Sequence, residues 1–379
     1  MDEYMLAEAV PMYGRMIHSP AGEQKLLAYS GRSGEYINSV SRAGLNIALL
    51  NEAEKHRQVK LHFNEPCRGY DAQAGEVIFA KKAIAAEVLI ATDGAGSVVR
   101  QSMDHQVSDF HSSSVFLDHG YKELNIPALP NGGFQLEKNA LHIWPRHQFM
   151  MIALPNHDGS FTCTLFLAKK GPQSLEALST EAAVTEFFKL EFGDAFDLMP
   201  TLLEDFFQNP TGDLGTVKCW PWYADGKALL LGDAAHAMVP FYGQGMNCAF
   251  EDVRVLDSLL SGSEVDWETV FREFAVLRKP NAAAIQEMAE ENFYEMRDRV
   301  ADPVFQRKRE LETKLEQNYP EYFSKYSMVT FREDLPYATA KAKGNAQDAF
   351  LMEFCRNLES VANVDLDELL SKMNKEIRT

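Results

Sequence analysis

The residues whose order could support redox chemistry lie between positions 231 and 252. A strand-like run, Leu231-Gly232-Asp233, is followed by a loop and then by the glycine turn Gly243-Gln244-Gly245 at the start of a helical segment. Asp233 at a strand end can accept a hydrogen bond from a sugar-like hydroxyl, and free N–H groups at a helix start favour negative charge. A reduced flavin carries negative charge at one ring edge, so the pattern favours a flavin site over a turn that glycine merely permits.

A second run of the same kind stands earlier in the chain, where an apolar strand leads into residues 92–100 (TDGAGSVVR). Residues 232–247 resemble the ribityl-binding motif of the class A flavoprotein aromatic hydroxylases, and residues 92–100 resemble the Asp-Gly motif of that class. Further segments resemble the kynurenine 3-monooxygenase family within this class and occur in the family's order. They are residues 14–19 (GRMIHS), 35–42 (EYINSVSR), 292–297 (NFYEMR) and 326–331 (YSMVTF).

The resemblance implies a substrate site built from both ends of the chain. The implied residues are Arg15, Tyr29, Asn292 and Tyr326 around the substrate's carboxylate, and Phe241 and Met296 along its aromatic ring. An arginine can grip a carboxylate with two parallel hydrogen bonds, while tyrosine and asparagine add neutral ones. Taken singly, Arg15 could be a surface cation and Tyr326 a packing residue, so only the joint pattern favours the site.

The resemblance also implies a set of contacts to FAD. These residues are Arg42, Cys67, Asp93, Asp233, Gly243, Gly245, Met246 and Asn247. Two of them have a structural alternative. Cys67 could be a small core residue whose backbone, not its thiol, meets the cofactor. Asp93 could cap the turn that follows it.

The implied activity is hydroxylation of L-kynurenine to 3-hydroxykynurenine by FAD, with NADPH and O2 as co-substrates, in tryptophan catabolism by the kynurenine pathway that leads to NAD biosynthesis. A hydroxylase for another aromatic acid is an alternative, against which Asn292 and Tyr326 argue. A flavoprotein relic that binds FAD weakly and has no activity is the other alternative.

No side chain is predicted to be a catalytic acid or base. His236 follows a predicted buried strand directly, and we expect neither an acid nor a nucleophile as its partner. No set of His, Cys, Asp and Glu has metal-ligand spacing, and no Gly-x-Ser-x-Gly motif occurs.

Composition narrows the partners. The 379 residues carry a formal net charge of −18, which disfavours nucleic acid and anionic membranes as partners. The 5 cysteines are scattered without a Cys-x-x-Cys pair, which favours a reduced, cytoplasmic setting over a disulfide framework. We expect no membrane span, and a homodimer is left open.

Hydrophobic periodicity predicts the elements that position these motifs. The strands are expected at 35–42, 77–80, 87–91, 141–144, 149–153, 161–166 and 227–233, with a Lys81-Lys82 turn between the second and third. The helices are expected at 43–56, at 181–190, and from 267 onward, punctuated by Pro280, Pro303 and Pro320 and ending in an amphipathic segment at 346–377.

These elements predict an α/β fold with an α+β insert. An incomplete Rossmann-like FAD-binding domain (residues 1–108 and 216–266) is expected to be interrupted by a substrate domain (109–215) built mainly on an antiparallel sheet. A C-terminal helical region (267–379) is expected to cover the active site.

The sequence departs from the class near its first residue. The expected Gly-x-Gly-x-x-Gly turn, which holds the FAD pyrophosphate at a helix N-terminus, does not occur there. We therefore expect that on the order of 30 residues or more of the opening unit are absent. A truncated or mis-started chain and a natural variant with weakened FAD affinity both fit this expectation.

The first prediction concerns the colour of the purified protein. Without the pyrophosphate cradle, this chain should purify colourless or only weakly yellow, because much of the FAD affinity comes from that turn. The absorbance of the purified protein near the flavin bands measures it, and a stoichiometric flavin spectrum would contradict it.

Overall fold

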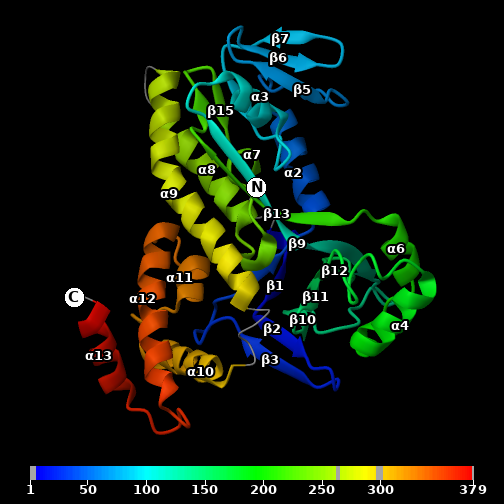
Figure 1. The fold of residues 1–379 in the computed structure, drawn as a ribbon, viewed down its shortest axis with the longest axis vertical. Helices are drawn as coiled ribbons and strands as arrows, with labels where there is room; N and C mark the ends of the chain where they lie inside the picture. Colours follow the sequence, from blue (N-terminus) through cyan, green and yellow to red (C-terminus); the bar gives the residue numbers. More distant parts are fainter. Residues whose placement is uncertain (1–5, 262–264, 296–301, 378–379) are drawn as a thin grey trace.

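The computed structural model describes residues 6–261, 265–295 and 302–377 (Figure 1). Within those residues the largest sheet has seven strands, in the order β13-β9-β12-β11-β10-β2-β3. Neighbouring strands are antiparallel except β10 and β2, which run parallel. The strands are β2 (Gly14–His18), β3 (Gln24–Ala28), β9 (His111–Ile126), β10 (Ala140–Arg146), β11 (Phe149–Pro155), β12 (Phe161–Ala168) and β13 (Gly212–Trp220).

The two faces of this sheet are covered by different parts of the chain. On β12, Phe161 and Leu165 belong to the cluster built with the short helices that follow, whereas Phe166 belongs to the cluster that includes Trp222, Leu229 and Phe274. Alternate side chains of a strand point to opposite faces, so one strand can serve both cores. The short helices are α4 (Glu181–Glu191), α5 (Gly193–Phe196) and α6 (Leu202–Gln208).

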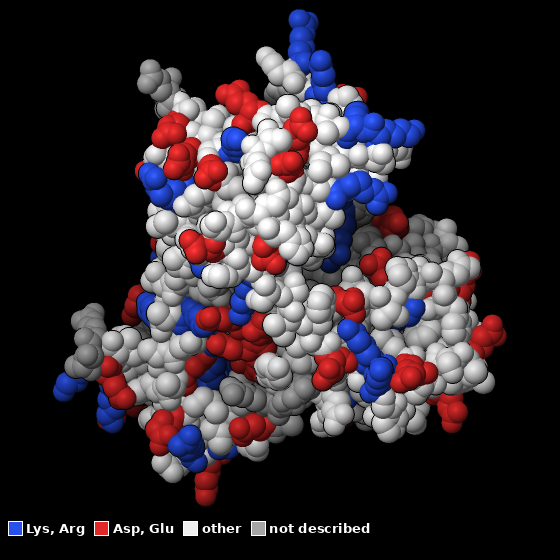
Figure 2. Space-filling model, turned by 45° about the horizontal axis from the view of Figure 1, so that its top comes forward, with Lys and Arg blue, Asp and Glu red and all other residues white. Residues whose placement is uncertain are grey.

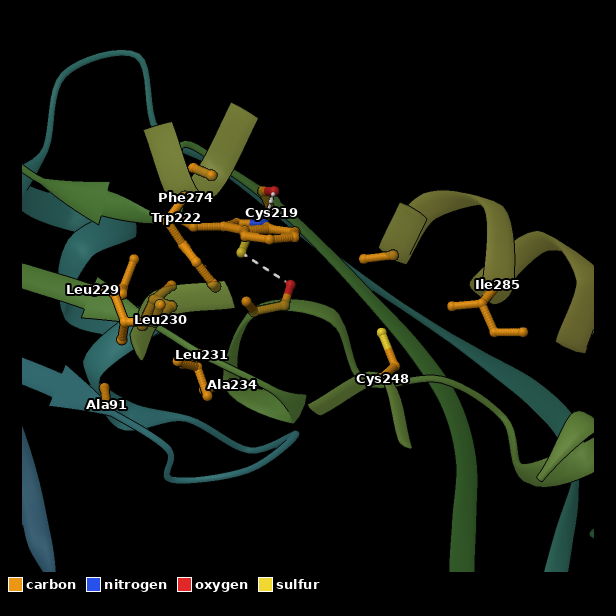
Figure 3. Packing of buried hydrophobic residues seen from close by; sticks show 14 of the residues in the cluster. Ala91, Cys219, Trp222, Leu229, Leu230, Leu231, Ala234, Cys248, Phe274 and Ile285 are labelled. Carbon is orange, nitrogen blue, oxygen red and sulfur yellow. Dashed lines mark hydrogen bonds between the residues drawn. The ribbon is translucent and has the colours of Figure 1, made fainter. Parts of the chain in front are cut away.

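A small sheet in the order β14-β15-β8 brings the two glycine-containing runs together. It consists of β14 (Tyr223–Ala224), β15 (Ala228–Leu230) and β8 (Leu89–Ala91), and β15 runs parallel to β8. Leu229 and Leu230 are fully buried, and the core around them includes Trp222 and Phe274 (Figure 3). Because parallel strands end at the same edge, the runs after β8 and β15 start side by side.

The remaining strands form two small units. A meander of β5 (Cys67–Asp71), β6 (Glu76–Phe79) and β7 (Ala83–Ala85) packs near α3 (Val98–Gln106), and β1 (Val10–Met12) pairs with β4 (Ile37–Ser39) before α2 (Arg42–Glu54). The expected Lys81-Lys82 turn therefore leads into β7 and not directly into the strand at 87–91. The sequence missed β7 because its three residues are too few to show the periodicity of a strand, and all three are exposed.

The later part of the chain is helical. Its elements are α7 (Asp233–His236), the 3-10 helix η1 (Pro240–Tyr242), α8 (Gly245–Leu260), α9 (Trp267–Tyr294), α10 (Pro303–Asn318), α11 (Lys325–Phe331), α12 (Tyr337–Arg356) and α13 (Leu366–Ile377). No helix among the described residues is long and apolar enough to cross a membrane.

Two expectations about these helices are wrong. Pro280 lies inside α9 and does not interrupt it, because residues such as Phe274 and Ile285 bury one side of the helix against the core. The segment at 346–377 is not one amphipathic helix but the end of α12 and the separate α13. The break is set by Asp365, whose carboxylate accepts a hydrogen bond from the Glu368 N–H at 3.0 Å and starts α13.

The predicted α/β class is confirmed by this arrangement of a mixed sheet, a parallel strand pair and covering helices. The predicted domain boundaries stay a prediction, and β2 and β3 extend the sheet formed by residues 111–220. Charges of both signs are spread over the face in Figure 2, with lysine and arginine side chains gathered at its upper right.

A buried chain of polar side chains links β2 to α5 on the face of the sheet opposite Arg15. His142 Nε2 lies 2.9 Å from the Glu137 carbonyl, so it donates there, and its Nδ1 accepts from His18 Nε2 at 2.8 Å. His18 Nδ1 lies 2.6 Å from the carboxylate of Asp194. Burial lowers the pKa of His142 to about 4.

Our second prediction follows from that shift. The pKa of His142 is lower in the folded state (about 4) than in the unfolded chain (about 6.5), so the unfolded state takes up a proton first on acidification. Stability should therefore fall by about 3 kcal/mol between pH 6.5 and 4, as measured by urea unfolding across that range. In His142→Gln this part of the pH dependence should flatten, and in the exposed His62→Gln it should persist. Parallel curves for wild type and His142→Gln would contradict the assignment.

Candidate functional site

The guanidinium of Arg15 lies against two aromatic rings that come from distant parts of the sequence. Its Cζ is 4.7 Å from the ring centroid of Tyr326 on α11 and 5.4 Å from that of Tyr29, which directly follows β3. The antiparallel pairing of β2 with β3 places Leu27 opposite Arg15 and so brings Tyr29 close. A cation near the start of the chain and a ring near its end therefore meet.

Three tyrosines form a row at this cation. Tyr326 stacks on Tyr29 (centroids 5.8 Å apart, rings inclined by 13°) and on Tyr242 of η1 (5.8 Å, 26°). The Tyr29 hydroxyl is buried without a well-formed hydrogen bond to any described residue. Burial raises the pKa of Tyr29, and Tyr326 adds to the rise, while nearby Arg15 opposes it. A cation beside an unsatisfied hydroxyl donor can bind an anion such as a carboxylate.

Asn292 and Phe241 lie next to this row. The Asn292 amide donates a hydrogen bond to the Phe241 carbonyl at 2.7 Å, and Phe241 is the neighbour of Tyr242 in η1. The Phe241 ring packs against Phe166 (5.2 Å) and Phe293 (4.7 Å). The structure thus brings Arg15, Tyr29 and Tyr326 together and joins Asn292 to the adjoining loop.

A small apolar cavity of about 20 Å³ opens beside those rings. It is lined in part by Met150, Phe166 and Phe293, and His119 closes against Phe293 with ring centroids 5.3 Å apart. A space of that size holds about one water molecule, so a larger ring requires these side chains to move. Met296, predicted to line the ring pocket, lies outside the described residues.

The loop from β15 to α8 supplies backbone groups and an acid. Gly243 has φ 72°, a left-handed conformation that favours glycine, and a Cβ there would meet no atom within 4 Å. The helix α8 begins at Gly245 with no side chain capping its first N–H groups, and Met246 and Asn247 in its first turn are exposed. Asp233 lies at the start of α7 with an exposed side chain. Desolvation by the protein around it raises its pKa, while the charges of His236 and Arg42 lower it.

The Asp-Gly run sits beside this loop and is tied to it by an arginine. The buried Arg100 donates hydrogen bonds to the carbonyl of Ala234 (2.7 Å) and to that of Ala95 (2.5 Å). Asp93 accepts from the N–H groups of Val98 (2.9 Å) and Val99 (3.3 Å), so it caps α3 as the structural alternative expected. Its predicted cofactor contact stays a prediction.

Cys67 begins β5 in the meander. Its thiol is 3.5 Å from the Gly69 carbonyl within the same strand. It is half-buried against the core that includes Trp222 and Phe274, as expected if it is a small core residue.

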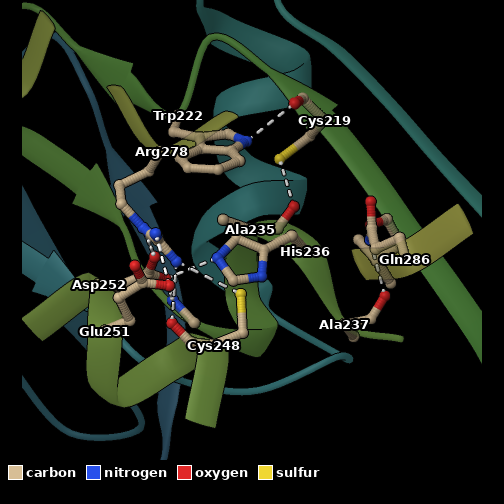
Figure 4. A network of polar contacts seen from close by, with 12 residues as sticks. Cys219, Trp222, Ala235, His236, Ala237, Cys248, Glu251, Asp252, Arg278 and Gln286 are labelled. Atoms are coloured by element: carbon tan, nitrogen blue, oxygen red, sulfur yellow. Dashed lines mark hydrogen bonds and ion pairs between the residues drawn. The ribbon is translucent and has the colours of Figure 1, made fainter. Parts of the chain in front are cut away.

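A buried ion network lies under the loop (Figure 4). The Asp252 carboxylate on α8 accepts hydrogen bonds from His236 Nε2 (2.6 Å), from Arg278 Nε on α9 (2.7 Å) and from the Gly232 N–H (3.2 Å). Burial alone would raise the pKa of Asp252, but the hydrogen bond from His236 and the charges of His236 and Arg278 hold it below its usual range. The network joins the end of β15 to two long helices.

This network corrects one expectation. His236 does have an acidic partner, Asp252, which stands sixteen residues later. Sequence spacing alone did not indicate that the two side chains meet. Possible metal-ligand atoms of His236, Cys248 and Asp252 also lie within 4.8 Å of one another. However, the Arg278 guanidinium contacts both the Asp252 carboxylate and the Cys248 carbonyl and thiol, so a cation already occupies the place.

Known proteins resemble this chain along most of its length. A family model described as an FAD binding domain matches residues 3–264. The chain is 46% identical to the kynurenine 3-monooxygenase of Myxococcus xanthus (strain DK1622) over 97% of this chain and 80% of that protein. It is 45% identical to that of Dictyostelium discoideum (98% and 85%) and 43% identical to that of Stenotrophomonas maltophilia (strain K279a) (100% and 84%). The chain belongs to the kynurenine 3-monooxygenase family.

Solved structures agree on the fold of this family member. The tetrameric form of 2-methyl-3-hydroxypyridine-5-carboxylic acid oxygenase matches with a TM-score of 0.64 at 20% identity, over 79% of this chain and 78% of that one. HpxO from Klebsiella pneumoniae, complexed with FAD and uric acid, matches with a TM-score of 0.63 at 16% identity, over 79% and 76%. At such identities the likeness concerns the fold alone.

The residues present fit the flavin that this family uses. The open left-handed turn at Gly243, the uncapped start of α8 and the exposed Asp233 form a surface where a flat group can approach the backbone. Arg42 begins α2 near enough to Asp233 for its charge to act on that carboxyl. We infer that these residues hold FAD.

Two residues of these contacts were not singled out from the sequence. Tyr242 lies inside the quoted loop, and only its neighbour Phe241 was named there. Arg278 gave no signal, because a single arginine in a long helix is usually a solvated residue.

Our third prediction tests the ion network. Asp252→Asn removes one of the two carboxylates that pair with the buried Arg278, the other being Glu251 (2.8 Å), and weakens charged hydrogen bonds at a buried site, so the protein should lose about 2–3 kcal/mol of stability. The control Glu368→Gln breaks an exposed ion pair with Lys372 (2.6 Å) and should change stability by no more than about 0.5 kcal/mol. Thermal unfolding measures both, and equal losses would refute the special role of Asp252.

Proposed function

We propose that the chain is an FAD-dependent monooxygenase that hydroxylates L-kynurenine to 3-hydroxykynurenine, with NADPH and O2 as co-substrates. The supporting observation is the identity of 43–46% to curated kynurenine 3-monooxygenases along nearly the whole chain. The overall reaction consumes one NADPH, one O2 and one proton and yields NADP⁺, water and the hydroxylated ring. When bound, FAD supplies the redox chemistry between NADPH and O2.

Within this proposal the carboxylate of the substrate binds at Arg15. The guanidinium offers two parallel N–H donors, and the unsatisfied Tyr29 hydroxyl offers a third donor beside it. A tyrosine hydroxyl is protonated at neutral pH, and the raised pKa of Tyr29 does not change this, so it can donate. Tyr326 covers the guanidinium from α11 and holds it in place.

The aromatic ring of the substrate then lies along Phe241. Because Asn292 fixes the Phe241 backbone and Phe166 and Phe293 flank its ring, these residues orient the substrate between the carboxylate site and the flavin loop. Met296 is proposed to complete this wall. Apolar side chains around the ring exclude water, which limits wasteful decay of activated oxygen.

The proposed cofactor contacts follow from the loop geometry. Arg42 and Asp233 are proposed to bind the sugar-phosphate part of FAD, and Gly243, Gly245, Met246 and Asn247 its ring system. The backbone of Cys67 is proposed to contact the adenine end of FAD, and Asp93 is proposed to contact FAD beside it. We further propose a cytoplasmic location and a homodimer, the latter to be measured by light scattering.

The fourth prediction tests the carboxylate site. Arg15→Ala should raise the KM for kynurenine on the order of a hundredfold while FAD affinity changes little, because the lost hydrogen bonds reach only the substrate. Lys25→Ala, an exposed cation on the neighbouring strand β3, is the matched control and should leave KM unchanged. Kinetics of NADPH oxidation measure both variants.

Two outcomes would contradict this proposal. Unchanged KM in Arg15→Ala would remove Arg15 from the pocket. NADPH oxidation that responds to another aromatic acid better than to kynurenine would support a different hydroxylase, and no response to any acid would support a silent relic.

A further inference from the structure

Gln244 is a buried side chain at the junction of the flavin loop and α8. It is 7% exposed, and its Oε1 accepts two hydrogen bonds. One comes from the Asn247 amide (2.9 Å) in the first turn of α8, and the other from the hydroxyl of Tyr337 (3.1 Å), the first residue of α12. A residue of the C-terminal helical region thus reaches the loop that starts α8.

The direction of these hydrogen bonds fixes the amide of Asn247. Its NH2 group is engaged by Gln244, so its Oδ1, at the other end of the planar amide, points away from Gln244. Asn247 is exposed and stands beside the uncapped N–H groups of α8. The side chain therefore presents a hydrogen-bond acceptor among backbone donors.

Tyr337 is fixed in position by the contacts at the start of α12. The Ala338 N–H next to it donates to Asn281 Oδ1 on α9 at 3.1 Å, which fixes the start of α12. Burial raises the pKa of Tyr337, and the nearby Cys248 and Glu251 on α8 add to the rise. Like any tyrosine below its pKa, its hydroxyl is protonated at neutral pH and can act as a donor.

The same helix also contacts the element that carries Tyr326. Asp348 on α12 forms an ion pair with Lys325 on α11 (2.7 Å), and a Cβ at Gly344 would collide with the Lys325 side chain. Helix α12 therefore touches the flavin loop at its first residue and the neighbour of Tyr326 farther along.

We propose that Tyr337 is a positioning residue for the cofactor: through Gln244 it holds the Asn247 amide so that its Oδ1 would accept a hydrogen bond from FAD. This inference rests on the proposed function, because it requires FAD at the α8 start. It gives the C-terminal helical region a direct hydrogen-bonded path to the cofactor, independent of the substrate carboxylate site.

The fifth prediction measures this path by FAD affinity. Tyr337→Phe removes only the hydroxyl and should raise the Kd for FAD about three- to tenfold, as expected for one hydrogen bond. The Kd is measured by adding protein to FAD and following the change in flavin fluorescence. Tyr319→Phe is the matched control, since its hydroxyl donates to Asp367 (2.7 Å) on α13 and should leave the Kd unchanged.

A double-mutant cycle separates positioning from general stabilisation. If Tyr337 acts through Asn247, then Tyr337→Phe should have no further effect on the Kd in the Asn247→Ala background. Additive effects of the two substitutions, or an unchanged Kd in Tyr337→Phe, would overturn the proposal. A thermal unfolding midpoint of the FAD-free Tyr337→Phe protein close to that of wild type shows that the fold is retained.

The outcome also distinguishes this inference from the proposed function. Wild-type protein that binds FAD but shows no kynurenine-dependent NADPH oxidation would refute the proposed activity while the cycle still tests the relay. An additive cycle in a kynurenine-responsive enzyme would refute the relay alone. Wild-type protein that binds no FAD at any concentration would overturn both.

Discussion

The arrangement of the site depends on satisfying one buried negative charge. The Asp252 carboxylate is fully buried and would be costly there without partners. Its partners are the Gly232 N–H at the end of β15, the His236 ring and the Arg278 guanidinium, which come from three different elements. Each can meet the carboxylate only if β15, α8 and α9 keep their relative positions. The start of α8 is thereby held at the edge of the small sheet.

That constraint extends from the cofactor side to the substrate side. Helix α9 carries Arg278 in its middle and Asn292 near its end, so the helix that neutralises Asp252 also fixes the backbone of Phe241. The loop between α7 and α8 is consequently held at both ends. Of its two aromatic residues, Phe241 packs against Phe166 and Phe293, which line the cavity, and Tyr242 belongs to the tyrosine row.

The C-terminal helices are attached to this frame through polar contacts as well as packing. Lys308 is buried between Glu312 (3.1 Å) and Asp348 (2.6 Å), and the latter also pairs with Lys325. The Arg32 guanidinium lies 3.8 Å from the ring centroid of Phe323, which docks the loop after Tyr29 onto this region. Because Lys308 and Glu312 are both buried, breaking these ion pairs would leave an uncompensated charge, so they hold α10 and α12 in place.

The sequence by itself determined the α/β class and the family, because hydrophobic periodicity and motif order are local properties of a chain. It gave β7 no signal, it misjudged Pro280, and it offered His236 no partner. Only the tertiary structure decided that Asp252 neutralises Arg278, that Tyr326 covers Arg15 and that Tyr337 reaches Gln244. Those contacts join residues up to 311 positions apart, and pairing at such separation depends on how whole elements pack, which no local pattern records.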